Sequence, residues 1–305
     1  MLLVLLMVFL VGCGGPDVKK EAQSLKQKYE EQTELTFLEV TKRVHTVKDW
    51  SEDLIKFSNE GKQKFEANIK SIEAEKVSKN VEPYKNVLKE RNSLYVKLLD
   101  LASRQVRLKL DNKPKSEIKD LAKQAEEVNS LLEQNIYDIE NEYSKVMTGK
   151  PATVMGVNGT NYLAYTASNV DIAVIKARWQ KDPIGSNPYL QKKPLGKFII
   201  IEVFVKNNQK DAITVDGNSF KLVDNQKREF STSHEAEIAL RADKGDSSKG
   251  FLTQLNPGMG TDFTFVFDVP EEINRYNTNL VARGGFAGNK VVLHSFPVKV
   301  KQIKQ

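Results

Sequence analysis

The sequence predicts two folded parts of different class, an antiparallel helical bundle or coiled coil followed by a β-sandwich. Two observations predict this. Residues 18–148 place apolar side chains at three- and four-residue spacing with few helix breakers, which is the pattern of amphipathic helices. Residues 151–301 are richer in Gly, Asn, Thr and Val and alternate with a period of two, which is typical of half-buried strands. With 305 residues, the chain is long enough for two domains.

The first 12 residues form an uncharged apolar run that predicts a signal peptide. They read MLLVLLMVFLVG. This run is shorter than the roughly 20 residues that a membrane-spanning helix needs, and it fits the hydrophobic region of a secretory signal. The Lys or Arg expected before such a run is missing. Either the true start lies upstream of Met1, or the signal is atypical.

The apolar run ends in Leu10-Val11-Gly12-Cys13, which resembles the bacterial lipobox. The resemblance implies that the thiol of Cys13 receives a diacylglyceryl group and that a signal peptidase cuts between Gly12 and Cys13. Two acyl chains give lasting attachment to membrane lipid, where one gives only marginal binding. We therefore expect residues 13–17 to be a lipidated cysteine with a short linker. The folded parts would lie at the cell membrane, on its extracytoplasmic face.

The helical half has three candidate breaks. They lie at residues 49–52, which have the spacing of a capping box, at 78–83 and at 111–114. If all three are real, four helices of similar length form an up-down bundle. The apolar stripe nevertheless keeps its phase through residues 44–57. Residues 18–78 could therefore also form one long helix of roughly 90 Å at 1.5 Å per residue, and the sequence leaves both open.

The apolar stripe of the helical half also has two interpretations. It could be a coiled coil that binds a partner, or the core of an intramolecular bundle, which we favour. This half resembles, in its pattern only, cell-wall-binding lipoproteins with helical bodies.

Short strands separated by turns organise the second half. The strongest covers residues 198–205, with Ile199, Ile201, Val203 and Val205 on one face. Another is predicted around Phe263, Phe265 and Phe267 because these alternate with polar residues. Turns are expected at residues 158–159, 216–217 and 256–258, and many short strands with frequent turns predict a sandwich. Further strands are predicted at residues 153–157, 161–166, 170–178, 212–215, 219–224, 237–240 and 290–299.

Four segments in the second half carry a resemblance to a known family. They are residues 196–208, 220–224, 255–258 and 269–270. In this order they resemble a family of secreted immunoglobulin-like domains of unknown function, common in Gram-positive lipoproteins and related to bacterial immunoprotective extracellular antigens. The resemblance implies an immunoglobulin-like β-sandwich without established catalytic residues. Residues 232–253 would then be a surface loop, and loops at sandwich ends are where binding usually resides.

The residues that carry enzyme chemistry are not gathered in any familiar motif. His45, His234 and His294 are isolated in the sequence, no GxSxG or Ser-xx-Lys motif occurs, and residues 284–288 fit a hairpin turn. The single cysteine cannot form an intrachain disulfide. A net charge of +6 falls short of the clustered basic face that nucleic-acid binding needs. We expect no catalytic residue, cofactor, metal or nucleic-acid partner.

Three functions remain as hypotheses. The first is a membrane-anchored binding module that presents the sandwich to an envelope protein or cell-wall polymer. The alternative is a structural or stress-related envelope component that binds wall polymer through its helical half. An exported hydrolase is the third, but the paired acids at 126–127 and 271–272 are adjacent in sequence, and adjacent helix positions do not face each other.

Overall fold

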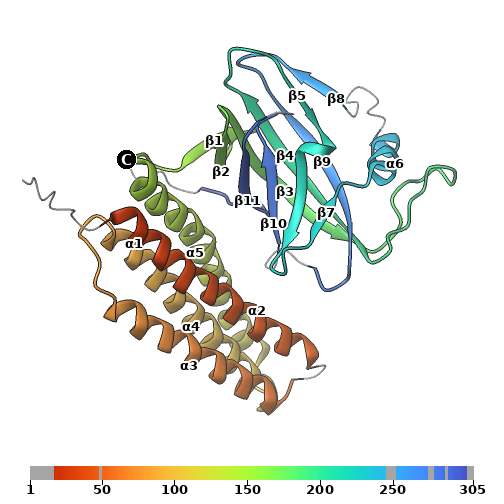
Figure 1. Ribbon diagram of the computed structural model, residues 1–305. Helices are drawn as coiled ribbons and strands as arrows, with labels where there is room; N and C mark the ends of the chain where they lie inside the picture. The colour runs from red at the N-terminus through yellow and green to blue at the C-terminus, as the bar shows by residue number, and fades with distance from the viewer. Residues whose placement is uncertain (1–16, 48–49, 245–251, 274–277, 286–287, 301–305) are drawn as a thin grey trace, which may run out of the picture.

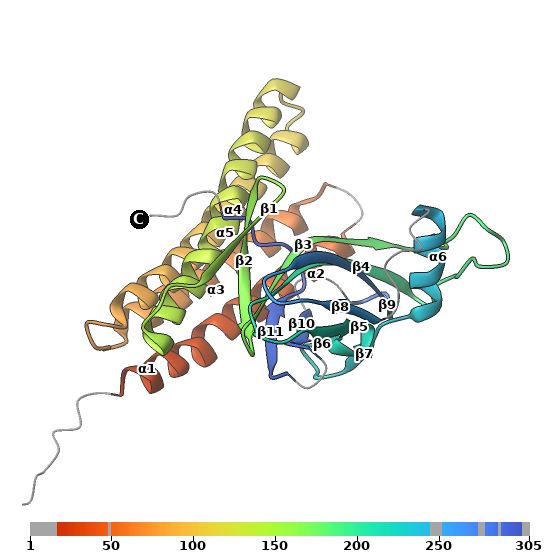
Figure 2. The same cartoon turned by 90° about the horizontal axis from the view of Figure 1, so that it is seen from above.

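The structure is a computed structural model, drawn in Figures 1 and 2. The figures show a bundle of long helices beside a layered β-structure. The described residues are 17–47, 50–244, 252–273, 278–285 and 288–300.

Four antiparallel helical segments joined by short loops form the first half. Residues 18–46 are continuous helix, in which a π-helical turn interrupts the α-helix. No helix among the described residues is long and apolar enough to cross a membrane. The elements are α1 (Val18–Leu25), the π-helical turn η1 (Lys26–Glu30), α2 (Glu31–Thr46), α3 (Glu52–Ala74), α4 (Glu82–Leu110) and α5 (Lys115–Thr148).

All three predicted breaks are confirmed, so the single long helix over residues 18–78 is wrong. The capping box at 49–52 is also wrong in detail. Ser51 precedes α3 as its N-cap and makes no side-chain capping hydrogen bond. By contrast, Asp17 caps α1, since its carboxylate accepts from the backbone N–H of Lys20 at 3.3 Å.

The apolar stripe forms an intramolecular core, which confirms the bundle interpretation. One cluster joins α1, η1, α3, α4 and α5, and a second joins α4 to α5. Burying these side chains supplies the main stabilisation of helices that would be marginal alone. The buried residues of the first cluster are Ala22, Leu25, Tyr29, Ile72, Val81, Tyr84, Leu88 and Ile139.

The second half is an antiparallel sandwich, as the sequence predicts. One sheet has the order β1-β2-β3-β4-β9, a second has the order β11-β10-β6-β7, and β5 pairs with β8. The strands are β1 (Thr153–Val157), β2 (Thr160–Ala167), β3 (Val170–Gln180), β4 (Lys197–Asn207), β5 (Ile213–Asp216), β6 (Phe220–Asp224), β7 (Glu229–Ser231), β8 (Leu252–Leu255), β9 (Gly260–Val269), β10 (Thr278–Arg283) and β11 (Lys290–His294).

The central strand β4 is buried on both faces near its start. Ile199, Ile201, Val203 and Val205 enter the core between the sheets, on the predicted shared face. Phe198 and Ile200 point the other way. They pack against helix α6 (His234–Lys244), which covers that part of the sheet.

Two sequence predictions are wrong where the structure forms helix α6. Residues 237–240 were expected as a strand, and residues 232–253 as a surface loop. Instead Ala236, Ala239 and Leu240 form the buried side of a helix that packs on β4 and β9. A strand was also expected over 290–299, but β11 ends at His294. Strands β7, β8 and β10 were not predicted.

Candidate interaction surface

The connection between β3 and β4 projects from the end of the sandwich. It covers residues 181–196 and extends outward beyond α6 in both views (Figures 1 and 2). Connections in compact domains usually have about 4–6 residues, and longer ones are often functional. We therefore considered what this loop exposes.

Large apolar side chains are exposed on this loop and on the elements next to it. Tyr189 is 96% exposed, Leu195 is 99% exposed and Trp179, near the end of β3, is 62% exposed. Leu190 on the loop and Ile238 on α6 are exposed as well. Single exposed apolar residues are ordinary, but a group at one end of a domain commonly marks an interaction site. Trp179 pairs with Ile199 and so lies on the face of the sheet away from α6, which carries Ile238. We therefore call the three loop residues Tyr189, Leu190 and Leu195 the tip surface.

Backbone hydrogen bonds hold the loop in a defined shape. The backbone N–H of Ile184 donates to the carbonyl of Lys192 at 2.8 Å, and that of Lys192 donates to the carbonyl of Ile184 at 2.8 Å. The side chain of Ile184 is buried in the cluster that α6 forms with the sheet. Tyr189 and Leu190 lie between these two anchoring residues, so the structure presents them on a closed loop.

Helix α6 makes hydrogen bonds and an ion pair with the same loop. Both the backbone N–H and the hydroxyl of Ser186 donate to Oδ1 of Asp243 at 2.7 Å. The backbone donor lowers the pKa of the Asp243 carboxyl, with the hydroxyl acting in the same direction. Lys192 forms an ion pair with Glu235 at the other end of α6. The loop is therefore pre-organised, which reduces the entropy cost of binding.

The return of the loop to β4 depends on a close backbone approach. The backbone N–H of Leu195 donates to both carboxylate oxygens of Asp268 at 3.1 Å. At Gly196, a Cβ atom would lie 2.4 Å from the carbonyl oxygen of Val269. A side chain at this position would therefore push the loop away from the end of β9.

Two lysines near the tip surface contact Glu271. Lys181 lies 3.0 Å from Glu271, and the ammonium of Lys197 donates to the backbone carbonyl of Glu271 at 2.8 Å. Burial and then the nearby charge of Lys181 lower the pKa of Lys197. The polar contacts of these groups lie beside the exposed apolar side chains of the loop.

A second site of interest lies where the sandwich meets the bundle. Tyr137 of α5 packs with Leu163 of β2 and with Val298 and Val300. Beside them, Nε2 of His294 lies 3.4 Å from Oε1 of Glu140 on α5, forming an ion pair between the halves when the imidazole is protonated. We call this contact the junction.

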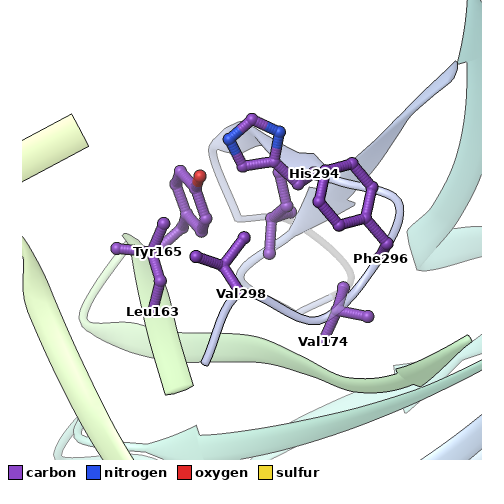
Figure 3. A pocket seen from close by; sticks show the side chains of 7 residues that line it. Leu163, Tyr165, Val174, His294, Phe296 and Val298 are labelled. Atoms are coloured by element: carbon purple, nitrogen blue, oxygen red, sulfur yellow. The ribbon is translucent and has the colours of Figure 1, made fainter. Parts of the chain in front are cut away.

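The sandwich side of the junction is closely packed. Figure 3 shows the rings of Tyr165, His294 and Phe296 around a narrow gap that Leu163 and Val298 also line. This gap does not admit a water molecule. It is therefore a packing feature and not a ligand pocket.

The bundle side of the junction is unusually rich in charge. Lys26 lies 3.4 Å from Glu30 and 3.9 Å from Glu140, and the hydroxyl of Tyr84 donates to Glu30 at 2.9 Å. Burial acts to lower the pKa of Lys26, but the charges of Glu30 and Glu140 raise it above its usual value. Burial acts to raise the pKa of Glu140, but His294 and Lys26 lower it to about 2. Both groups are therefore charged at neutral pH.

The residues singled out from the sequence fall in different places. Gly12 and Cys13 lie outside the described residues, as does the side chain of His45. His234 lies 3.7 Å from Glu237 within α6. His294 is not isolated, because the fold brings it to Glu140. No group of three or more potential metal ligands occurs within the described ranges.

Sequence reasoning missed both the tip surface and the junction. The length of the segment 181–196 and its three prolines were available as signals of an unusual loop. No sequence signal joins Glu140 to His294, since they come from the helical half and the last strand.

A comparison with protein families gives a match that lies in the sandwich half. A family model described as a domain of unknown function, DUF4352, matches residues 163–291. This range includes the four segments on which the family resemblance was based. No curated protein matches the chain.

Solved structures similar to this chain include three bacterial proteins. A conserved hypothetical protein from Bacillus anthracis is 17% identical, with a TM-score of 0.33, covering 49% of this chain and 96% of its own. The yjhA protein from Bacillus subtilis is 15% identical, with a TM-score of 0.33, covering 43% and 94%. The secreted protein MPT63 from Mycobacterium tuberculosis is 9% identical, with a TM-score of 0.27, covering 47% and 91%.

Proposed function

We propose that this chain is a membrane-anchored, extracytoplasmic binding module whose sandwich binds a protein partner of the cell envelope through the tip surface. The observation that carries the proposal is the group of exposed apolar side chains on an ordered loop. The lipobox-like segment ending in Cys13 supports the anchor. The family match is consistent with a binding module and names no activity.

A protein partner fits the tip surface better than a wall polymer. Aromatic rings can stack on sugars, but Leu190 and Leu195 are aliphatic and offer no hydrogen bond to a polar glycan. Aromatic residues such as Tyr189 are enriched in protein–protein contacts. The paired charges around the loop supply a polar rim.

Removing two exposed side chains of the tip surface should abolish most of the binding. We expect the double variant Tyr189→Ser and Leu195→Ser in the full chain to lose about tenfold or more in affinity, because a few central residues carry most of the interface energy. Thermal unfolding should be unchanged, since both side chains are almost fully exposed. Photo-cross-linking from position 189 in intact envelopes would first identify the partner, whose binding is then titrated.

Val292→Ser on β11 is the matched control, because Val292 is also an exposed apolar residue of the sandwich. It should bind like the unmodified chain. Equal affinity of the double variant and the unmodified chain would contradict the proposal. If position 189 gives no protein adduct and the full chain sediments with purified wall material, the wall-polymer alternative replaces it.

A further inference from the structure

We propose that the junction is a pH-responsive joint, in which protonated His294 holds the sandwich against the bundle through Glu140 and loss of that proton loosens the contact. This inference concerns the orientation of the two halves. It is independent of what the tip surface binds, because the residues involved belong to opposite ends of the sandwich (Figure 1).

Charged groups from several elements face the junction. The π-helical turn contributes Lys26 and Glu30, α2 contributes Glu34, α4 contributes Arg91, and α5 contributes Glu140. Arg91 is buried and lies 3.6 Å from Glu34. A π-helical turn redirects the side chains around it and is often found at functional positions. Here it contributes Lys26 and Glu30 to the cluster.

The titratable tyrosines around the junction stay neutral over the relevant range. They are Tyr84 on α4, Tyr143 on α5 and Tyr165 on β2. Burial raises the pKa of Tyr84, Tyr143 and Tyr165. Burial raises the pKa of the Glu34 carboxyl as well. Histidine is the side chain whose charge ordinarily changes between pH 5 and 8, and a variant of His294 separates its effect from that of Glu34.

Glu140 is the carboxylate that the imidazole faces. Oε1 of Glu140 lies 3.4 Å from Nε2 of His294 and 3.9 Å from Nζ of Lys26, and the Glu140 side chain is mostly buried. A buried carboxylate is costly unless cations lie beside it. Loss of the proton from His294 therefore leaves Glu140 with the more distant Lys26 and weakens the contact between the halves.

The closed junction also buries a polar atom without a partner. The hydroxyl of Tyr165 makes no hydrogen bond within the described residues, and water could supply one if the contact opened. Nε2 of His294 makes no hydrogen bond there either, so its charge is what attracts Oε1 of Glu140 at 3.4 Å. When the imidazole is neutral, that attraction is lost and opening becomes more favourable.

The connections allow such a movement without unfolding either half. Helix α5 ends at Thr148, Gly149 has a positive φ of 76°, and β1 begins at Thr153. This linker is short, so the halves stay adjacent. The apolar contact of Tyr137 with Val298 and Val300 can act as the pivot.

A distance measurement between the halves tests the joint. Spin labels are placed at two exposed positions, Leu131→Cys on α5 and Val292→Cys on β11, in the full chain carrying Cys13→Ser. We expect a single narrow distance at pH 5.5. Between pH 5.5 and pH 7.5 the ratio of closed to open molecules should fall about tenfold, the size of a typical coupling.

Two variants identify the group responsible. His294→Gln should give the same broad distribution at both pH values, because it cannot gain the proton. His234→Gln, which removes a histidine that pairs within α6, should respond to pH like the unmodified chain. The proposal is contradicted if the labelled, otherwise unmodified chain gives the same distance distribution at both pH values. It is equally overturned if His294→Gln keeps the full response.

Discussion

Replacing Cys13 with alanine is expected to move nearly all of the protein from the membrane fraction to the soluble fraction of cells. The physical reason is that the proposed attachment rests on acyl chains bound to this thiol, each buried methylene contributing about 0.8 kcal/mol. Without the thiol, no diacylglyceryl group can be transferred. The measurement is cell fractionation followed by mass spectrometry of the product.

Gly14→Ala is the control for this experiment, because Gly14 follows the cysteine and lies outside the tetrapeptide that resembles the lipobox. Its product should remain membrane-bound, with two acyl chains on an N-terminal cysteine. The anchor proposal fails if Cys13→Ala stays in the membrane fraction. It also fails if the native product carries a free thiol with residues 1–12 still attached.

Replacing Gly196 with alanine is expected to lower the free energy of unfolding by about 3 kcal/mol, at the upper end of overpacking effects. The added Cβ would lie 2.4 Å from the carbonyl oxygen of Val269, 3.0 Å from Cα of Pro270 and 3.1 Å from the backbone nitrogen of Glu271. All three are backbone atoms, so no flexible side chain can move aside. Urea denaturation measures the change.

The same substitution should also weaken binding through the tip surface. Moving the loop away from β9 breaks the hydrogen bond from Leu195 to Asp268, so the exposed side chains lose their fixed position. Gly156→Ala is the matched control. A Cβ there meets Asn161 at an ordinary 3.4 Å, and stability should change by less than about 0.5 kcal/mol. Equal stability of the Gly196→Ala variant and the unmodified chain would show that this close approach is not rigid.

Helix α6 shows where prediction from local pattern fails. Ala236, Ile238 and Leu240 alternate in the sequence, which is why residues 237–240 resembled a strand. The same segment contains Glu, Ala and Leu, and Arg241 follows it; all four are good helix formers. The outer face of β4, formed by Phe198 and Ile200, decides between them, because a helix there buries Ala236, Ala239 and Leu240 together.

The two sites were predictable to different degrees. The unusual length of the loop at residues 181–196 was visible in the sequence, but the exposure of Tyr189 and Leu195 was not. Their exposure depends on where α6 and the end of β9 hold the loop. The pairing of His294 with Glu140 could not be predicted, because it depends on how the sandwich is set against the bundle.

Local spacing by itself determined the division into a helical and a β half, the three candidate helix breaks and most strands, because apolar periodicity and breakers act over a few neighbouring residues. Tertiary structure decided the rest. Surfaces from distant parts of the chain come into contact only in the tertiary structure. Those contacts decide which apolar side chains stay exposed to water and which charges become buried together. For this protein those contacts create the tip surface and the junction.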